Sequence, residues 1–357
     1  MVEYAVPFGA LRRWLGTPII RRKLRRMVTY RRAVTQGDIE APLSTRQEAP
    51  MHVAVTGSSG LVGSALVAFL TTKGHQVTRL VRRSPRGSGE VQWDPAEGVR
   101  DLSRLEGVDA VVHLAGENIA SGRWTPRRKA EIRRSRVEGT RRLCESLARI
   151  ARPPKALVSA SAVGFYGDRR DEILREDSPP GTDFLAEVCR EWEAATEPAS
   201  RALVRVVQLR FGVILSPAGG ALKKMLLPFR LGMGGKIGNG AQFMSWITLD
   251  DVVGAVHHVL STESLVGPVN AVAPAPVTNA EFTRILARVL WRPVLAPMPA
   301  FAARLAFGEL ADALLLASAR VVPTRLEGSG YRFRHPELDG ALRHLLGRQR
   351  GSASATA

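Results

Sequence analysis

The chain has 357 residues, 45% of them hydrophobic, which is enough for a large buried core, and it carries a net charge of +18. Its basic residues concentrate at 12–32 and 123–142 without a helix-turn-helix, zinc or aromatic-basic RNA-binding pattern, so we expect no specific nucleic-acid partner. The two cysteines lie far apart, which argues against a disulfide framework and indicates a reducing, cytoplasmic location. The sequence has no metal-ligand spacing, so we expect no metal site. It also has no run of about eighteen apolar residues, so we expect no transmembrane helix.

Residues 1–36 form a basic N-terminal segment. Thr17-Pro18 is typical of a helix start. Apolar residues then recur at helical spacing, with arginines between them: Ile20, Leu24, Met27, Val28 and Val34. This helix either docks on the main domain, lies on an acidic membrane surface through residues 12–32, or belongs to a unit that is partly missing. Residues 37–50 are polar and predict a linker.

A glycine-rich turn follows the linker, in the stretch VAVTGSSGLVG over 53–63. The apolar run predicts a strand over 52–56, the glycines recur every third residue, and an apolar helix pattern covers 61–72. This order suits a dinucleotide pyrophosphate, because the glycines permit a tight turn and the helix N-terminus offers free N–H groups. The alternative is a glycine-rich turn with no ligand. The expected contacts are Gly57, Ser58, Ser59, Gly60, Leu61, Val62 and Gly63.

The end of the second predicted strand, over 76–81, indicates which dinucleotide binds. An NAD site usually places Asp or Glu there, whereas this chain has Arg82 and Arg83. A guanidinium can bind a 2′-phosphate that a carboxylate would repel, so we expect NADP(H). The alternative is that both arginines lie in a solvated turn.

Strand and helix patterns alternate from 51 to 215. The expected strands are 52–56, 76–81, 109–115, 155–161 and 203–210, and the expected helices are 61–72, 125–150 and 183–200. This predicts an α/β fold with a Rossmann-type, doubly wound parallel sheet. Residues 216–348 predict a smaller, mixed substrate lobe, with some elements returning to the sheet, and 349–357 predict a disordered tail.

Four segments carry a resemblance to a known family: TGSSGLVG, VVHLAGENIASGRWT, SASAVGFYGD and WITLDDVVGAVHHVL. Together they resemble the extended short-chain dehydrogenase/reductase superfamily and, within it, the atypical branch called the epimerase family, over residues 51–346. The resemblance implies an NADP(H)-dependent oxidoreductase acting on a small carbonyl or hydroxyl compound. A homodimer is also compatible with it. Residues 1–35, beginning YAVPFGALRRWL at Tyr4, resemble the C-terminal end of a START-like helix-grip domain.

The resemblance also implies cofactor contacts beyond the glycine turn. Small residues after the strand at 109–115 allow close backbone approach, and Glu131 and Arg136 face the cofactor from the next helix. For Glu131 the alternative is a charge-laced exposed helix. The implied contacts are Leu114, Ala115, Gly116, Glu117, Glu131, Arg136, Ser159, Phe211, Gly212 and Val213.

The implied catalytic group is incomplete. The superfamily uses a Tyr, a Lys four residues later and a Ser at a strand end, and Ser161 fits the serine. The helix over 183–200 has Phe184 or Leu185 at the tyrosine position, and Val188 or Cys189 at the lysine position. Tyr166, followed four residues later by Arg170, is either a proton donor or a structural hydrogen-bonding group.

The missing pair leaves an alternative function open, a catalytically silent NADP(H)-binding sensor or interaction protein. Epimerisation of a nucleotide sugar is less favoured, because that chemistry retains NAD through its cycle and uses the Tyr/Lys pair.

Overall fold

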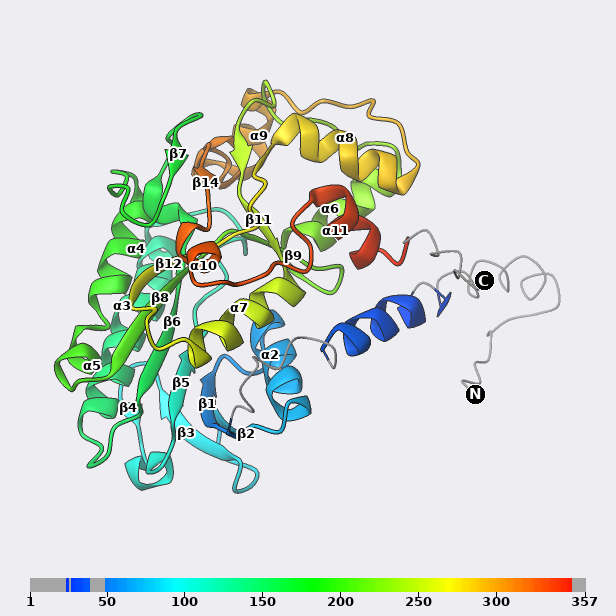
Figure 1. Cartoon of the computed structure of the whole chain (residues 1–357). Helices are drawn as coiled ribbons and strands as arrows, with labels where there is room; N and C mark the ends of the chain where they lie inside the picture. The colour runs from blue at the N-terminus through cyan, green and yellow to red at the C-terminus, as the bar shows by residue number, and fades with distance from the viewer. Residues whose placement is uncertain (1–23, 26, 39–48, 349–357) are drawn as a thin grey trace, which may run out of the picture.

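The computed structural model describes residues 24–25, 27–38 and 49–348 (Figure 1). Its centre is an eight-stranded sheet in the order β12-β8-β6-β5-β1-β2-β3-β4, in which only β4 runs antiparallel to its neighbour. The strands are β1 His52–Thr56, β2 Gln76–Val81, β3 Glu90–Asp94, β4 Gly98–Val99, β5 Ala110–His113, β6 Ala156–Ala162, β8 Arg205–Phe211 and β12 Gly267–Ala271. The Rossmann-type fold class is confirmed.

The order in which successive strands are added to the sheet reverses beside β1. β2 and β3 add on one side of β1, and the chain then returns to place β5 on the other side. β1 is buried along most of its length, as its continuous apolar run predicts, whereas β2 exposes Gln76 and Arg79. Ligands of such sheets bind beyond the carboxyl ends of the strands at this reversal point.

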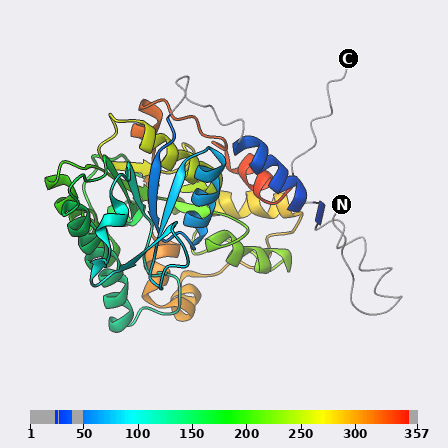
Figure 2. The same ribbon diagram turned by 90° about the horizontal axis from the view of Figure 1, so that it is seen from below.

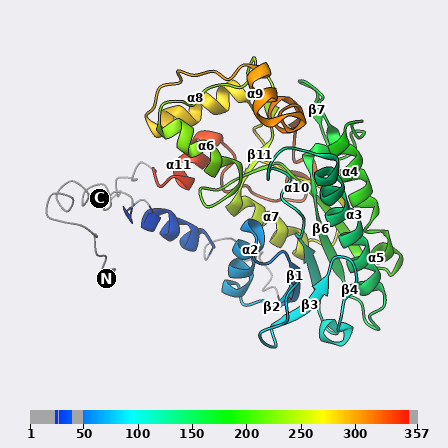
Figure 3. The same cartoon turned by 180° about the vertical axis from the view of Figure 1, so that it is seen from behind.

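Helices cover both faces of the sheet, as Figures 1 and 3 show from opposite sides. α2 (Leu61–Thr72) and α7 (Leu249–Ser261) share one apolar core with the strands. α3 (Pro126–Ala148) and α5 (Glu197–Arg201) contribute to the core on the opposite face, and α4 (Phe184–Ala194) packs beside α3. The expected helix over 183–200 is therefore two helices.

The remaining elements form a mixed lobe around a separate apolar core. α6 Gly220–Arg230, α8 Asn279–Leu290 and α11 Leu338–Leu345 contribute to this core, whereas α10 Thr324–Gly328 packs on β12 of the sheet. This part of the chain also contains α9 Ala300–Phe307 and a π-helical segment Ala311–Leu316. Short strands pair two by two: β9 Val213–Leu215 with β11 Trp246–Thr248, β10 Phe243–Met244 with β13 Val277–Thr278, and β7 Ile173–Leu174 with β14 Arg320–Val321. Two 3-10 segments, Leu102–Leu105 and Val163–Tyr166, complete the fold.

One buried carboxylate ties the last part of the chain to α7. Asp251 accepts hydrogen bonds from the hydroxyls of Thr248 and Tyr331, and from the backbone N–H groups of Arg334 and His335 at 2.7 and 3.1 Å. Its side chain has no exposure to solvent. The start of α7 and the 331–335 segment therefore depend on each other for hydrogen bonding.

A helix over residues 27–38 docks on this same region, beside α11 (Figure 2). Tyr30 packs edge-on against His344, with ring centroids 5.3 Å apart, and Asp38 forms an ion pair with Arg334 at 2.7 Å. Of the three interpretations of the N-terminal segment, the described residues support docking. Residues 1–23, 39–48 and 349–357 lie outside the described part of the chain, as does most of the basic stretch 12–32.

No helix in the described residues is both long enough and apolar enough to cross a bilayer.

Candidate functional site

The glycine turn between β1 and α2 is closely packed. Gly57 has φ +65°, and a Cβ there would lie 2.9 Å from the carbonyl carbon of Leu114. A Cβ on Gly63 would lie 2.2 Å from the carbonyl oxygen of Gly57. Neither position accommodates a side chain, so the turn must run close to both the end of β5 and the first turn of α2.

The N-terminus of α2 is free to bind an anion. Its N-cap residue Gly60 supplies no side-chain cap, and no acidic residue occupies the first turn, where Leu61 and Val62 lie. The hydroxyls of Ser58 and Ser59 make no hydrogen bond within the described residues. These groups fit a dinucleotide pyrophosphate, because a helix N-terminus with unpartnered N–H groups is a binding site for phosphate.

The two arginines after β2 differ in their surroundings. Arg83 makes two hydrogen bonds to the carboxylate of Glu90, at 2.8 and 2.6 Å. Chiefly through these bonds, Arg83 lowers the pKa of Glu90 to about 2. Arg82 is exposed and forms no ion pair with the described residues. Arg82 is therefore available to a ligand, whereas the charge of Arg83 is already paired with Glu90.

A series of buried hydrogen bonds holds the end of β5 beside the glycine turn. His113 is hydrogen-bonded to Thr56 at 2.8 Å and to Thr140 of α3 at 3.0 Å. The hydroxyl oxygen of Thr56 also accepts the backbone N–H groups of Leu114 and Ala115. Burial lowers the pKa of His113 to about 4, so the imidazole stays neutral at pH 7. These hydrogen bonds could not be predicted from the sequence, in which the only signal is a histidine within an apolar strand.

Arg136 and Glu131, both on α3, have different roles in the structure. Arg136 donates a 3.0 Å hydrogen bond to the carbonyl of Glu117, beside the exposed Gly116, so it lies at the end of β5. Glu131 pairs with Arg127 and Arg128 on its own helix. This arrangement favours the alternative interpretation of Glu131, in which it is one of many charged residues on a helix surface, over a contact with the cofactor.

Ser161, at the end of β6, belongs to a network of side-chain hydrogen bonds. Ser161 donates its hydroxyl proton to Glu193 of α4 at 2.6 Å. The carboxylate of Glu193 receives two further hydrogen bonds from Arg210 of β8, both at 2.8 Å. Arg210 is 4% exposed and Glu193 is 13% exposed. Ser159, also on β6, is buried and makes only a 3.4 Å contact with the carbonyl of Ala160.

Tyr166 belongs to the same network. Its hydroxyl donates to the side-chain oxygen of Asn270 at 2.7 Å and accepts from Arg210 at 2.9 Å. The side chain is fully buried, and burial raises its pKa. Arg170, the expected partner, is exposed, and the cation beside Tyr166 is Arg210. These contacts favour the structural interpretation of Tyr166 over that of a proton donor.

The first turns of α4 contain no tyrosine or lysine. Phe184 packs edge-on against Trp124, with centroids 5.4 Å apart, and lies under the Lys129 ammonium. Leu185, Val188 and Cys189 are buried. Burial raises the pKa of the Cys189 thiol to about 12, so this side chain cannot replace a basic lysine.

The segment Phe211, Gly212 and Val213 joins β8 to β9. A Cβ on Gly212 would lie 2.6 Å from the backbone oxygen of Ser245, so packing within the protein explains this glycine. A cofactor contact at 211–213 stays a prediction.

A cluster of Asp250, His335 and His344 brings three potential metal ligands within 4.8 Å of one another. The two imidazole rings are stacked, with centroids 4.2 Å apart and planes 27° apart. Nearly parallel rings cannot both direct an in-plane nitrogen lone pair at one ion. His344 instead bonds to Asp250 at 2.7 Å, which joins α11 to α7.

Comparison with known proteins adds the family. A model of the NAD dependent epimerase/dehydratase family matches residues 53–271, and a domain of unknown function (DUF1731) matches residues 298–345. The chain belongs to the NAD dependent epimerase/dehydratase family. The resemblance of residues 1–35 to a helix-grip domain receives no support, and most of that segment lies outside the described residues.

Individual relatives cover most of this epimerase-family chain. The Mycobacterium tuberculosis epimerase family protein MT2273 is 46% identical over 290 residues, which are 81% of this chain and 96% of the relative. A crystal structure of human epimerase family protein SDR39U1 with NADPH aligns with TM-score 0.77 and 37% identity, covering 84% of this chain and all of the human one. A nucleoside-diphosphate sugar epimerase from Corynebacterium glutamicum aligns with TM-score 0.77 and 41% identity, over 92% of this chain and 66% of that one.

Proposed function

We propose that this protein is an NADP(H)-dependent oxidoreductase of the atypical extended short-chain type, acting on a small carbonyl or hydroxyl compound. The observation that carries the proposal is the closely packed glycine turn, which directs the free N-terminus of α2 to the carboxyl end of the sheet, with an unpaired Arg82 nearby. The NADPH in the structure of the human relative supports the choice of cofactor.

The residues divide by their place on the sheet. The turn over 57–63 would bind the pyrophosphate, and Arg82 the 2′-phosphate. Residues 114–117, Arg136 and Ser159 would line the path from ribose to nicotinamide, with 211–213 beyond them. When bound, the nicotinamide supplies the hydride donor or acceptor.

We assign Ser161 to the substrate oxygen. Its proton is directed at Glu193, so its lone pairs are free to accept a hydrogen bond from a substrate hydroxyl. In alcohol oxidation the substrate proton would pass to Ser161 as the Ser161 proton passes to Glu193. Arg210 would hold Glu193 in place through its two hydrogen bonds, and Tyr166 would position Arg210.

Titration with NADPH and NADH, followed by nicotinamide fluorescence, tests cofactor binding. We expect micromolar affinity for NADPH and at least about tenfold weaker binding of NADH, since one phosphate contact contributes roughly 1.4 kcal/mol or more. A panel of aldehydes and ketones then tests turnover, comparing the wild type with Ser161→Ala. Tight NADPH binding without turnover of any compound would instead support a catalytically silent binding protein.

A further inference from the structure

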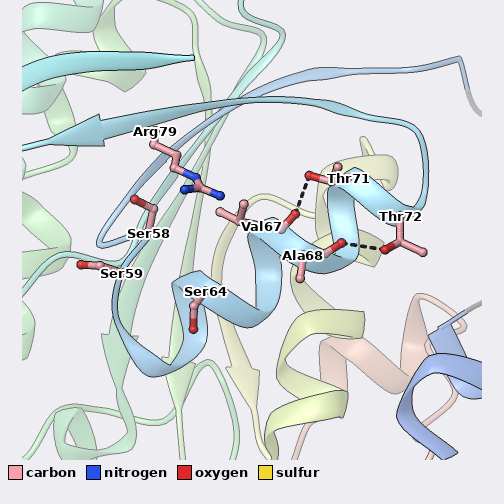
Figure 4. Close-up of a pocket in the computed structure, with 8 residues that line it drawn as sticks. All are labelled: Ser58, Ser59, Ser64, Val67, Ala68, Thr71, Thr72 and Arg79. Carbon is pink, nitrogen blue, oxygen red and sulfur yellow. Dashed lines mark hydrogen bonds between the residues drawn. The ribbon is translucent and has the colours of Figure 1, made fainter. Parts of the chain in front are cut away.

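A cavity of about 650 Å³ lies along the outer side of α2, next to the glycine turn (Figure 4). Most of its lining residues carry a hydroxyl group, and one carries a positive charge. The lining residues are Ser58, Ser59, Ser64, Val67, Ala68, Thr71, Thr72 and Arg79. The site described above uses two of these residues and leaves the charged one unexplained.

Arg79 is the charged residue of this cavity. It lies in the middle of β2, where its neighbour Leu80 is buried in the core and Arg79 itself is exposed on the opposite side of the strand. Figure 4 shows its guanidinium extending from β2 toward α2. Arg79 pairs in register with Glu90 of β3, but both oxygens of Glu90 bind Arg83. Within the described residues the guanidinium of Arg79 has no hydrogen-bonding partner.

The hydroxyl groups of the cavity differ in whether their protons are already used in hydrogen bonds within the protein. Ser64, Thr71 and Thr72 each donate to a backbone carbonyl of α2, at 3.3, 2.8 and 2.9 Å. Ser58 and Ser59, in the glycine turn, make no such bond. The free donors of the cavity are therefore Arg79 and these two serines, so an anion is best placed at the end nearest the glycine turn.

We propose that Arg79, with Ser58 and Ser59, binds the 2′-phosphate of NADP(H) and shares with Arg82 the selection against NADH. The inference deepens the proposed function and rests on it. Arg83 is less available for this role than Arg79, because two of its N–H groups already bind Glu90 and its charge is paired there. The 2′-phosphate is the only group that distinguishes the two cofactors, so a cation that binds it changes the affinity for NADPH alone.

The test compares Arg79→Gln with Arg141→Gln, a matched loss of one positive charge at an exposed residue of α3. Dissociation constants for NADPH and NADH are measured by nicotinamide fluorescence at fixed ionic strength. We expect Arg79→Gln to weaken NADPH binding by about tenfold or more and to change NADH binding by less than about twofold, with Arg141→Gln unchanged for both. Both variants should keep the wild-type melting temperature, because both side chains are exposed.

The outcomes separate the two proposals. If the wild type binds neither cofactor, the proposed function fails. If the wild type prefers NADPH and Arg79→Gln retains the full preference, only the role of Arg79 is overturned. Equal weakening of NADPH and NADH by Arg79→Gln would also overturn it, because such a loss would concern the shared part of the cofactor.

Discussion

Ser161 of β6 donates a 2.6 Å hydrogen bond to Glu193 of α4, and Glu193 in turn accepts two hydrogen bonds from the guanidinium of Arg210. This contact is where the chain departs from the Tyr/Lys arrangement of its superfamily. The helix that would carry the tyrosine and lysine instead contributes a carboxylate one turn further along. The carboxyl end of the sheet thus keeps a connected polar network built from different residues.

The Glu193–Arg210 pair should be important for stability. Glu193→Gln removes the charge that compensates a nearly fully buried arginine, and such a loss costs about 3–5 kcal/mol. Urea unfolding measures the change. Glu187→Gln is the matched control, because Glu187 lies on the same helix, is 49% exposed and pairs with Arg133 at the surface. Equal stability of the two variants would show that burial of the Glu193 pair has no energetic consequence.

Tyr166→Phe distinguishes a structural tyrosine from a catalytic one. The substitution leaves Asn270 and Arg210 each without one buried hydrogen bond, so we expect a loss of about 1–3 kcal/mol in unfolding free energy. Once a substrate is found, kcat should fall by less than about tenfold at every pH. A fall of about a hundredfold or more, with a changed pH profile, would restore Tyr166 as the proton donor.

His113 predicts a pH dependence of stability. Burial lowers its pKa in the folded protein to about 4, below the usual 6.5 of histidine, so the unfolded chain binds a proton more readily. Its contribution is present above pH 6.5 and is lost as pH falls through about 4, by about 3 kcal/mol in total. NMR of the imidazole nitrogens should show a neutral ring at pH 5. A His113 that titrates near 6.5 in the folded protein would contradict the prediction.

The docked helix over 27–38 should stabilise the rest of the chain. Tyr30→Ala removes a ring that packs on the lobe core and on His344, and should lower the melting temperature by several degrees. Arg31→Gln, an exposed neighbour on the same helix, is the control. A double-mutant cycle between Asp38 and Arg334 should give a coupling of about 0.5–1 kcal/mol. No effect of Tyr30→Ala would mean that the helix is a passive attachment.

Local signals in the sequence predict part of this fold well. The bounds of β1, α2 and β2 agree with expectation, because apolar periodicity and glycine positions determine each of them over a few residues. β3 has no counterpart among the expected strands, and β12 fits only the general expectation that some elements of 216–348 return to the sheet. Both contain polar residues and become strands by pairing with β2 and β8. The helix expected over 183–200 divides where Pro198 enters a new first turn.

The candidate site shows the same division. The glycine turn is local, and its geometry follows from adjacent residues. The partners of Ser161 and Tyr166 lie 32 and 104 residues away, so only tertiary packing brings them together. Arg83 is only seven residues from Glu90, yet no helical or strand spacing in the sequence indicated that they would pair.

The hydrogen bonds of Asp251 affect how this protein folds while a ribosome is still synthesising it. While the nascent chain ends before residue 331, a carboxylate destined for full burial lacks three of its partners. The start of α7, which packs on the sheet, therefore cannot reach its final state until about eighty further residues have been synthesised. The nucleotide-binding half of the molecule is thus completed by the segment 331–335, close to the C-terminal end of the described residues. Cotranslational folding of that half alone should therefore stop at an incompletely packed intermediate.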